Sequence, residues 1–161
     1  MRRIAGLGVL AVSAGLALSV PGSAQTVQAE PGSGPGLGKV TIVITELRNT
    51  KGVVRACMTT NPDIFPRCRE DPASHRTVVD AGEKVTLTFR NVKPGRYSVA
   101  LLHDENDNGK ADRALLGMMP KEGFGFSRDA PVRMGPPSFK DAAFDFDGVE
   151  TRLTIKMRYM L

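Results

Sequence analysis

The chain has 161 residues, of which 41% are hydrophobic and 24% are charged, so its composition is that of a globular protein and not of a disordered one. The length suits one domain. The formal net charge is +5, but no basic cluster is interleaved with aromatic residues, so a nucleic-acid partner is not expected. The 17 Gly and 11 Pro lie scattered between apolar runs, which favours short strands and many turns over a helix bundle.

The N-terminus has the pattern of an export signal. Two arginines follow Met1, residues 4–20 are uncharged and mostly apolar, and small residues continue up to Ala24. This pattern predicts a signal peptide over residues 1–24, and hence a periplasmic or secreted protein. The alternative is an uncleaved membrane anchor, for which the run is short. No other stretch approaches the ~20 apolar residues of a membrane span, so no span is expected after cleavage.

A Gly, Pro and Ser-rich segment over residues 25–38 predicts a flexible linker, followed by a folded domain over residues 39–161. Cys57 and Cys68 are the two cysteines of the chain. An exported protein resides in an oxidising compartment, so we expect them to form a disulfide. The alternative is a redox-active or metal-binding thiol pair, but their spacing fits no CxxC pattern.

Apolar residues alternate with polar ones in several short runs bounded by turn residues. Strands are predicted over residues 40–45, 53–59, 77–80, 84–90, 97–103 and 152–159, with a further one near 142–146. The first two are expected to form a hairpin through the turn at residues 49–52. Ser138 is placed to cap one short helical turn. About seven strands with polar faces predict an all-β, antiparallel two-sheet sandwich.

An acidic loop follows the strand that ends at His103. Asp104, Asn106 and Asn108 occupy alternate positions, Gly109 follows, and Asp112 comes three residues later. Oxygen ligands in this spacing can wrap Ca²⁺, which takes six to eight oxygens.

A complete calcium loop ends in a bidentate glutamate, but this loop has Leu115 at that position, so Glu122 is the candidate replacement ligand. The alternative is a metal-free turn, because Asn and Asp side chains bind neighbouring backbone N–H groups.

Two phenylalanines, Phe124 and Phe126, alternate with Gly123 and Gly125. They could form a stacking platform for a sugar or peptide ligand. The alternative is a segment folded over the end of the core, in which the rings are buried and the glycines permit close backbone approach.

The chain resembles a secreted bacterial family known as domain of unknown function 2141, over residues 40–159. The resemblance rests on the motifs Tyr97-Ser98-Val99-Ala100, His103-Asp104-Glu105-Asn106, Asn108-Gly109-Lys110, Asp112, Gly117, Pro120, Glu122-Gly123-Phe124-Gly125-Phe126-Ser127, Pro137 and Phe139. Met118-Met119 stands where an Ile is more usual. The resemblance implies an exported β-sandwich of the transthyretin-like or immunoglobulin-like kind with no established activity.

We therefore expect a non-enzymatic exported module. Its long loop from Asp104 to Pro137 would be ordered by Ca²⁺ and would bind an envelope protein or a small ligand. One alternative is a purely structural envelope protein with a metal-free loop. Another is a small hydrolase that uses Glu122 or Asp104 together with His103 as acid and base. No other cofactor and no particular oligomeric state is predicted.

Overall fold

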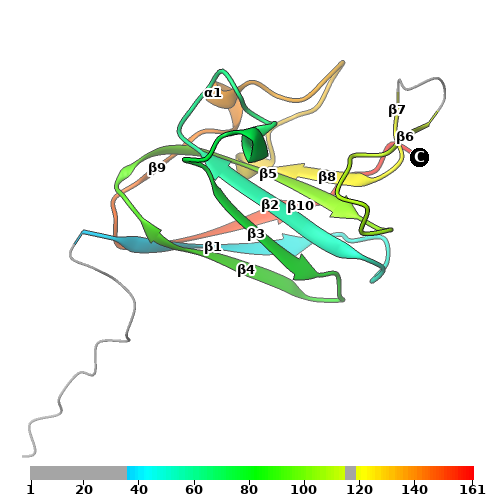
Figure 1. Cartoon of the computed structure of the whole chain (residues 1–161), viewed down its shortest axis with the longest axis horizontal. Coiled ribbons are helices and arrows are strands. Elements are labelled where there is room, and N and C mark those ends of the chain that lie inside the picture. Colours follow the sequence, from blue (N-terminus) through cyan, green and yellow to red (C-terminus); the bar gives the residue numbers. More distant parts are fainter. Residues whose placement is uncertain (1–35, 115–118) are drawn as a thin grey trace, which may run out of the picture.

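The computed structural model describes residues 36–114 and 119–161 and has two packed β-sheets (Figure 1). One sheet has the order β10-β1-β4. The other has the order β3-β2-β5-β8, and β9 pairs with β5 beside β8. The strands are β1 Gly38–Thr45, β2 Val53–Thr59, β3 His75–Asp80, β4 Val85–Val92, β5 Gly95–Asp104, β8 Gly123–Phe126, β9 Phe144–Phe146 and β10 Glu150–Lys156. The all-β sandwich predicted from alternation is thereby confirmed.

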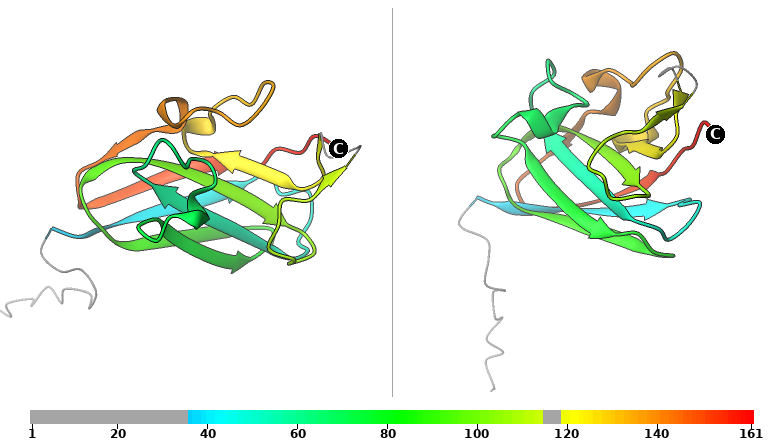
Figure 2. Two further views of the ribbon diagram at one scale, coloured as in Figure 1. Left: turned by 45° about the horizontal axis from the view of Figure 1, so that its top comes forward. Right: turned by 45° about the vertical axis from the view of Figure 1, so that its right-hand side comes forward.

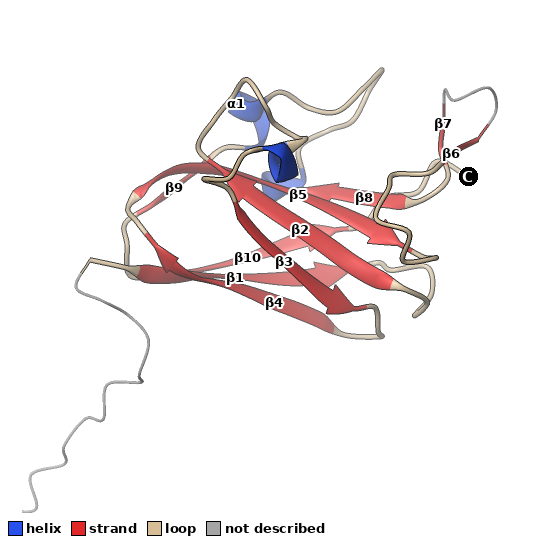
Figure 3. Ribbon diagram, in the orientation of Figure 1, coloured by secondary structure: helices blue, strands red, loops and turns tan. Residues whose placement is uncertain are grey.

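The remaining elements are short. β6 Arg113–Ala114 and β7 Met119–Pro120 form a two-stranded ribbon, and the helical turns are η1 Cys68–Glu70, η2 Ser127–Asp129 and α1 Phe139–Ala142. Ser138 caps α1 as predicted, because its side chain accepts a hydrogen bond from the backbone N–H of Asp141. The helical turns all lie on the side of the five-stranded sheet that faces away from β1 and β4 (Figure 3). The predicted signal peptide and most of the predicted linker lie outside the described residues.

Two expectations about strand pairing are wrong. β1 and β2 do not form a hairpin, because the chain crosses between sheets after β1, whose antiparallel partner is β4. β10 pairs with β1 in parallel, with Ile42 opposite Leu153, so the sandwich is not wholly antiparallel. Both differences arise where the chain crosses from one sheet to the other. The alternation of apolar and polar residues within one strand does not indicate which strand it pairs with.

Apolar side chains from the two sheets meet in one main core. Its buried members are Val40, Ile42, Ile44, Val54, Ala56, Met58, Val85, Leu87, Phe89, Val92, Tyr97, Val99, Leu101, Phe146, Ile155 and Met157. These are the residues that alternate with polar ones along each strand, so the burial of every second side chain accounts for the pattern in the sequence.

A third layer covers the outer face of the five-stranded sheet, as the views in Figure 2 show. It consists of the segment between β2 and β3 and the segment from η2 to α1. Its small core contains Ala100, Phe126, Ala130 and Ala142, against which Phe65 and Phe124 pack. Strand β5 is therefore buried on both faces, which explains why its side chains do not alternate between core and solvent.

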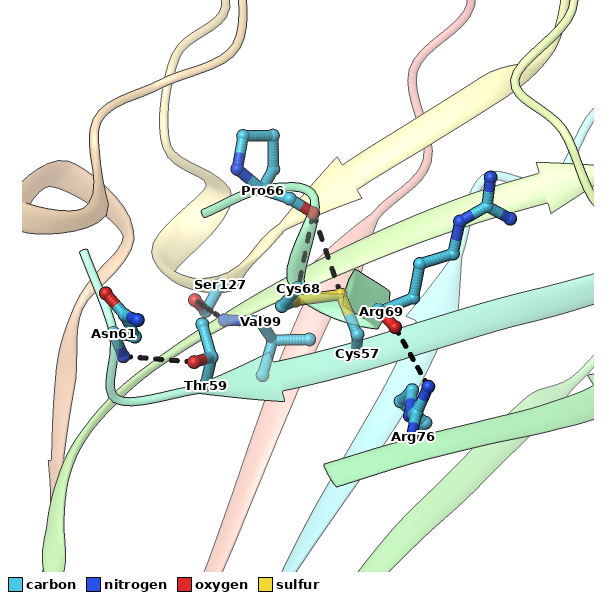
Figure 4. Close-up of a disulfide and its surroundings, with 9 residues drawn as sticks. All are labelled: Cys57, Thr59, Asn61, Pro66, Cys68, Arg69, Arg76, Val99 and Ser127. Carbon is cyan, nitrogen blue, oxygen red and sulfur yellow. Dashed lines mark hydrogen bonds between the residues drawn. A yellow bond between two sulfur atoms is a disulfide. The ribbon is translucent and has the colours of Figure 1, made fainter. Parts of the chain in front are cut away.

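Cys57 and Cys68 form the expected disulfide, with their Cα atoms 5.9 Å apart. The bond ties η1 to the outer side of β2 (Figure 4). The closed ring spans 11 residues in sequence, for which chain-entropy arithmetic gives about 3 kcal/mol of stabilisation. The disulfide thus holds down one half of the third layer, whose Phe65 ring contacts Phe126 edge-on at a centroid distance of 5.9 Å.

The segment from Asp104 to Pro137 is not one long loop. It contains the β6–β7 ribbon and strand β8, whose residues Phe124 and Phe126 pair with Leu102 and Ala100 of β5. The alternation of Phe and Gly in β8 has a simple cause. The Phe rings face the third layer, whereas the glycines face the C-terminal segment that crosses directly beneath. A Cβ atom on Gly125 would lie 2.9 Å from Ile155 Cγ2 and 3.0 Å from the carbonyl oxygen of Lys156.

We predict that Gly125→Ala destabilises the protein by about 1–3 kcal/mol, because the added methyl group forces β8 away from β10. The measurement is the free energy of unfolding in urea. Gly82→Ala is the matched control, since a Cβ atom there meets nothing within 4 Å. Equal stability of the two variants would contradict the close crossing.

Candidate functional site

The acidic loop begins at the buried end of β5, where His103 is held from two sides. Its Nδ1 lies 2.7 Å from the Tyr159 hydroxyl and its Nε2 lies 2.8 Å from the carbonyl oxygen of Lys51. A carbonyl oxygen only accepts, so Nε2 carries the hydrogen and Nδ1 accepts from Tyr159. His103 is 0% exposed, and its role in the structure is to fasten the C-terminal segment and the β1–β2 connection to the end of β5.

Asp104 is also 0% exposed, and all its hydrogen-bond donors come from the chain itself. Its carboxylate accepts from Arg55 Nε at 2.6 Å, from the backbone N–H of Gly109 at 2.8 Å and from that of Asn108 at 3.0 Å. Burial opposes ionisation of Asp104, but these three donors outweigh burial and hold the pKa of the carboxyl below its ordinary value. Arg55 also bridges to Asp107. Asp104 thus fixes both the start and the bend of the loop.

Glu105 binds the connection between β1 and β2. Its two carboxylate oxygens accept from Arg48 Nε at 2.7 Å and from Asn49 Nδ2 at 2.9 Å. Burial acts to raise the pKa of Glu105, yet the hydrogen bonds from Asn49 and Arg48 lower it overall. The Arg48 guanidinium lies 4.6 Å from the centre of the Tyr159 ring and donates to the carbonyl oxygen of Lys121 at 2.8 Å. One arginine therefore joins three separate segments.

The remaining predicted ligands form a closed network around Asp112. The side-chain amide of Asn106 donates to Asp112 Oδ2 at 2.9 Å, and that of Asn108 donates to both oxygens at 3.1 Å. The amide oxygens of the two asparagines accept from the backbone N–H groups of Asn108 and Lys110. The structure thus brings Asp104, Asn106, Asn108 and Asp112 into one compact bend. What holds the four side chains in this bend is hydrogen bonds from N–H donors of the chain.

Glu122 packs against this bend from the start of β8. Its Oε2 accepts from the backbone N–H of Asp112 at 3.1 Å, while its buried Oε1 has no hydrogen-bond partner among the described residues. The pKa of Glu122 is raised, mainly by burial and further by the negative charges of Asp104 and Asp112. Among the described carboxylates of the bend, Glu122 is therefore the buried one with an oxygen left over.

The donors present do not fit a metal ion in this arrangement. No group of three or more His, Cys, Asp or Glu side chains within residues 36–114 and 119–161 could hold one. The Arg55 guanidinium supplies the positive charge that a cation would otherwise provide to the carboxylates. The N–H groups of the two asparagine amides supply the positive ends of their dipoles. A cation would have to displace Arg55 from Asp104.

Phe124 and Phe126 are packed side by side, with ring centroids 6.1 Å apart, but they do not form an open platform. Phe126 is buried and Phe124 half-buried beneath the third layer. The structure therefore has the buried rings of the alternative interpretation. The segment itself, however, is a strand of the sheet and not a loop over the end of the core.

Sequence reasoning missed the basic partners of the loop. Arg55 lies 49 positions before Asp104, and Arg48 lies 57 positions before Glu105. Neither has a local pattern that distinguishes it from a solvated charge on a strand or in a turn. The one sequence feature that could have indicated these ion pairs is Arg55 itself, a charged residue in the middle of the otherwise weakly polar strand β2.

Two packed sheets joined by crossovers, with an internally bonded acidic loop at one end, define the chain as a β-sandwich domain. The family model described as "Uncharacterized protein conserved in bacteria (DUF2141)" matches residues 42–154. The chain belongs to this family, as the resemblance in its motifs indicates. Among curated proteins and solved structures, neither comparison gives a significant match. No helix in the described part of the chain is long and apolar enough to cross a membrane.

We predict that Arg55→Met destabilises the protein by about 2–4 kcal/mol, because it leaves the buried charge of Asp104 without its guanidinium partner. The control is Arg96→Met. Arg96 pairs with Asp145 at 3.5 Å, with both side chains more than half exposed, and such a pair contributes at most about 1 kcal/mol. Urea unfolding of both variants gives the comparison. Similar losses would show that Asp104 does not depend on Arg55.

Proposed function

We propose that this chain is an exported, non-enzymatic binding module that engages an envelope protein through residues 131–137, which connect η2 to α1. Export is supported by the N-terminal pattern of two arginines, an uncharged run and small residues up to Ala24. The disulfide between Cys57 and Cys68 suits the oxidising compartment that export would reach.

The observation that carries the proposal is the full exposure of Met134 at the tip of a segment whose base is anchored. Ala130, before the segment, and Ala142, after it, are both buried in the small core. Ser127 strengthens the anchor, because its hydroxyl donates to the carbonyl oxygen of Ala142 at 2.5 Å. The loop therefore presents an apolar tip from a fixed base, which lowers the entropy lost on binding.

The chemistry of the segment suits a protein partner. Pro131, Pro136 and Pro137 limit its conformations, and Arg133 adds a positive charge beside Met134. A shallow pocket of about 380 Å³ is lined by residues of this segment together with Ser138 and Asp141. Methionine adapts its shape to a partner surface, and exposed Met residues are common at such interfaces.

A non-enzymatic role is proposed because two of the three candidate acid–base groups, His103 and Asp104, are engaged in structural hydrogen bonds. Both ring nitrogens of His103 and both oxygens of Asp104 have hydrogen-bond partners within the chain. Neither the pocket beside Met134 nor a second pocket between the sheets is lined by His103, Asp104 or Glu122. A substrate would have to replace structural hydrogen bonds before either group could transfer a proton.

A photo-crosslinking amino acid at position 134, introduced in cells of the source bacterium, tests the proposal. We expect one adduct of defined mass in the envelope fraction, formed with a single protein. The matched control carries the same amino acid at position 78, where Val78 is 51% exposed on β3. Identical adducts from both positions, or none from position 134, would reject a binding role for residues 131–137.

Structural Ca²⁺ in the acidic loop is a second candidate, favoured by the unpartnered Oε1 of Glu122 beside Asp112. In this candidate the ion would draw on Glu122 and the four residues Asp104, Asn106, Asn108 and Asp112. It requires Arg55 to give up Asp104, since the guanidinium and the ion compete for the same oxygens. The primary proposal instead treats the loop as metal-free, with Arg55 as its permanent counter-ion.

The two candidates differ in the melting temperature with and without Ca²⁺. If the ion binds, millimolar Ca²⁺ raises the melting temperature of the wild-type protein, a chelator reverses the increase, and Glu122→Gln abolishes it. Asp63→Asn, which changes an exposed carboxylate outside the loop, should keep the full response. We expect no response to Ca²⁺ in any of the three proteins. A calcium-dependent increase in the wild type would overturn that expectation.

A further inference from the structure

A pocket of about 260 Å³ lies between the two sheets, where β3 begins and where β4 gives way to β5. It lies at the opposite end of β5 from the acidic loop, because Tyr97 is near the start of that strand and Asp104 at its end, and it shares no residue with the segment around Met134. Its lining residues are Thr60, Ala73, His75, Asn91, Lys93 and Tyr97. This volume is slightly below the usual lower limit of ligand pockets, about 300 Å³, so the pocket suits a small molecule and not a polymer.

His75 forms the inner wall together with aromatic rings of the main core. Its ring centroid lies 6.1 Å from that of Tyr97 and 6.2 Å from that of Phe89. Burial lowers the pKa of His75, so at neutral pH the imidazole is uncharged and can both donate and accept a hydrogen bond. Its nitrogens have no hydrogen-bond partner within residues 36–114 and 119–161. The Tyr97 hydroxyl donates to the carbonyl oxygen of Lys93 at 3.0 Å, which fixes the opposite wall.

Apart from the Tyr97 hydroxyl, the polar side chains that line the pocket have no hydrogen-bond partner in the described part of the chain, in contrast to those of the acidic loop. The side chains of Thr60, Asn91 and Lys93 make no hydrogen bond or ion pair with another described residue. Ser74, which lies between Ala73 and His75 in sequence but does not itself line the pocket, has a buried hydroxyl with no partner in the described part of the chain. Buried hydroxyl groups are generally hydrogen-bonded.

Asn91 is held toward this end of the sandwich by a local distortion of β4. The register between β1 and β4 shifts between Val40, opposite Phe89, and Gly38, opposite Val92. Asn91 lies in this bulge with a φ of 56°, in the left-handed region. Such bulges redirect side chains and are common beside binding sites.

We propose that this pocket binds a small carboxylate with a flat apolar body. The ammonium group of Lys93 pairs with the carboxylate, and the amide of Asn91 and the hydroxyl of Thr60 lie within the same lining to donate hydrogen bonds. The flat body rests against the rings of Tyr97 and His75, where aromatic edges and faces favour planar groups. The proposal is independent of the binding role of residues 131–137.

Benzoate is the probe, with benzamide as its neutral isostere. Titration of the purified full-length protein, followed by ¹⁵N–¹H NMR, should give saturable shifts at Ala73, His75 and Lys93. Lys93→Gln should weaken benzoate binding about tenfold, the effect of losing one hydrogen bond to a charged group, without changing benzamide binding. Lys84→Gln is the matched control, since Lys84 is exposed at the opposite end of β4.

Three results would overturn the proposal: shifts that do not saturate or that scatter over the surface, equal affinity for benzoate and benzamide, and equal weakening by Lys84→Gln. His75→Phe gives a second test, because it keeps a ring in the core contact but removes both nitrogens, and it should also reduce benzoate affinity. Far-UV circular dichroism shows whether each variant is folded. None of these results depends on the crosslinking at position 134.

Discussion

The end of strand β5 is the point on which most of the chain's long-range order depends. His103 and Asp104 are adjacent and fully buried, and they bind different parts of the molecule. His103 fastens Tyr159 and Lys51, and Asp104 fastens Arg55 and the bend at Gly109. A buried carboxylate is tolerated only with enough donors, so the energetic demand of Asp104 fixes both the position of β2 and the path of the loop.

The same demand explains why the acidic loop has so many polar residues without forming an open site. Each carboxylate that leaves β5 is satisfied by an arginine of the neighbouring strand β2 or of the β1–β2 connection, or by the loop's own N–H groups. Glu105 reaches Arg48, and Asp107 shares Arg55 with Asp104. The spacing of oxygen-bearing residues that resembles a calcium loop therefore also suits a self-contained turn, because both solutions place positive charge, or the positive end of a dipole, at the centre of the bend.

Local features of the fold follow from the sequence, whereas the connections between layers do not. The strand at residues 53–59 and the capped turn after Ser138 have the predicted bounds and role, because alternation and capping involve only near neighbours. The parallel pairing of β1 with β10 and the ion pair of Arg55 with Asp104 join residues far apart in sequence. A single sequence holds no record of such pairings, since many registers satisfy the same apolar alternation.

The distribution of satisfied and unsatisfied polar groups separates structure from recognition in this molecule. At the acidic end, nearly every donor and acceptor is paired within the chain, so a ligand there gains little without breaking existing bonds. Around His75, by contrast, the imidazole and the neighbouring Ser74 hydroxyl have no partner among the described residues. Met134 likewise makes its apolar surface available at the tip of an anchored segment. A ligand at these two places breaks no hydrogen bond within the chain, so recognition is more favourable there than at the acidic motif.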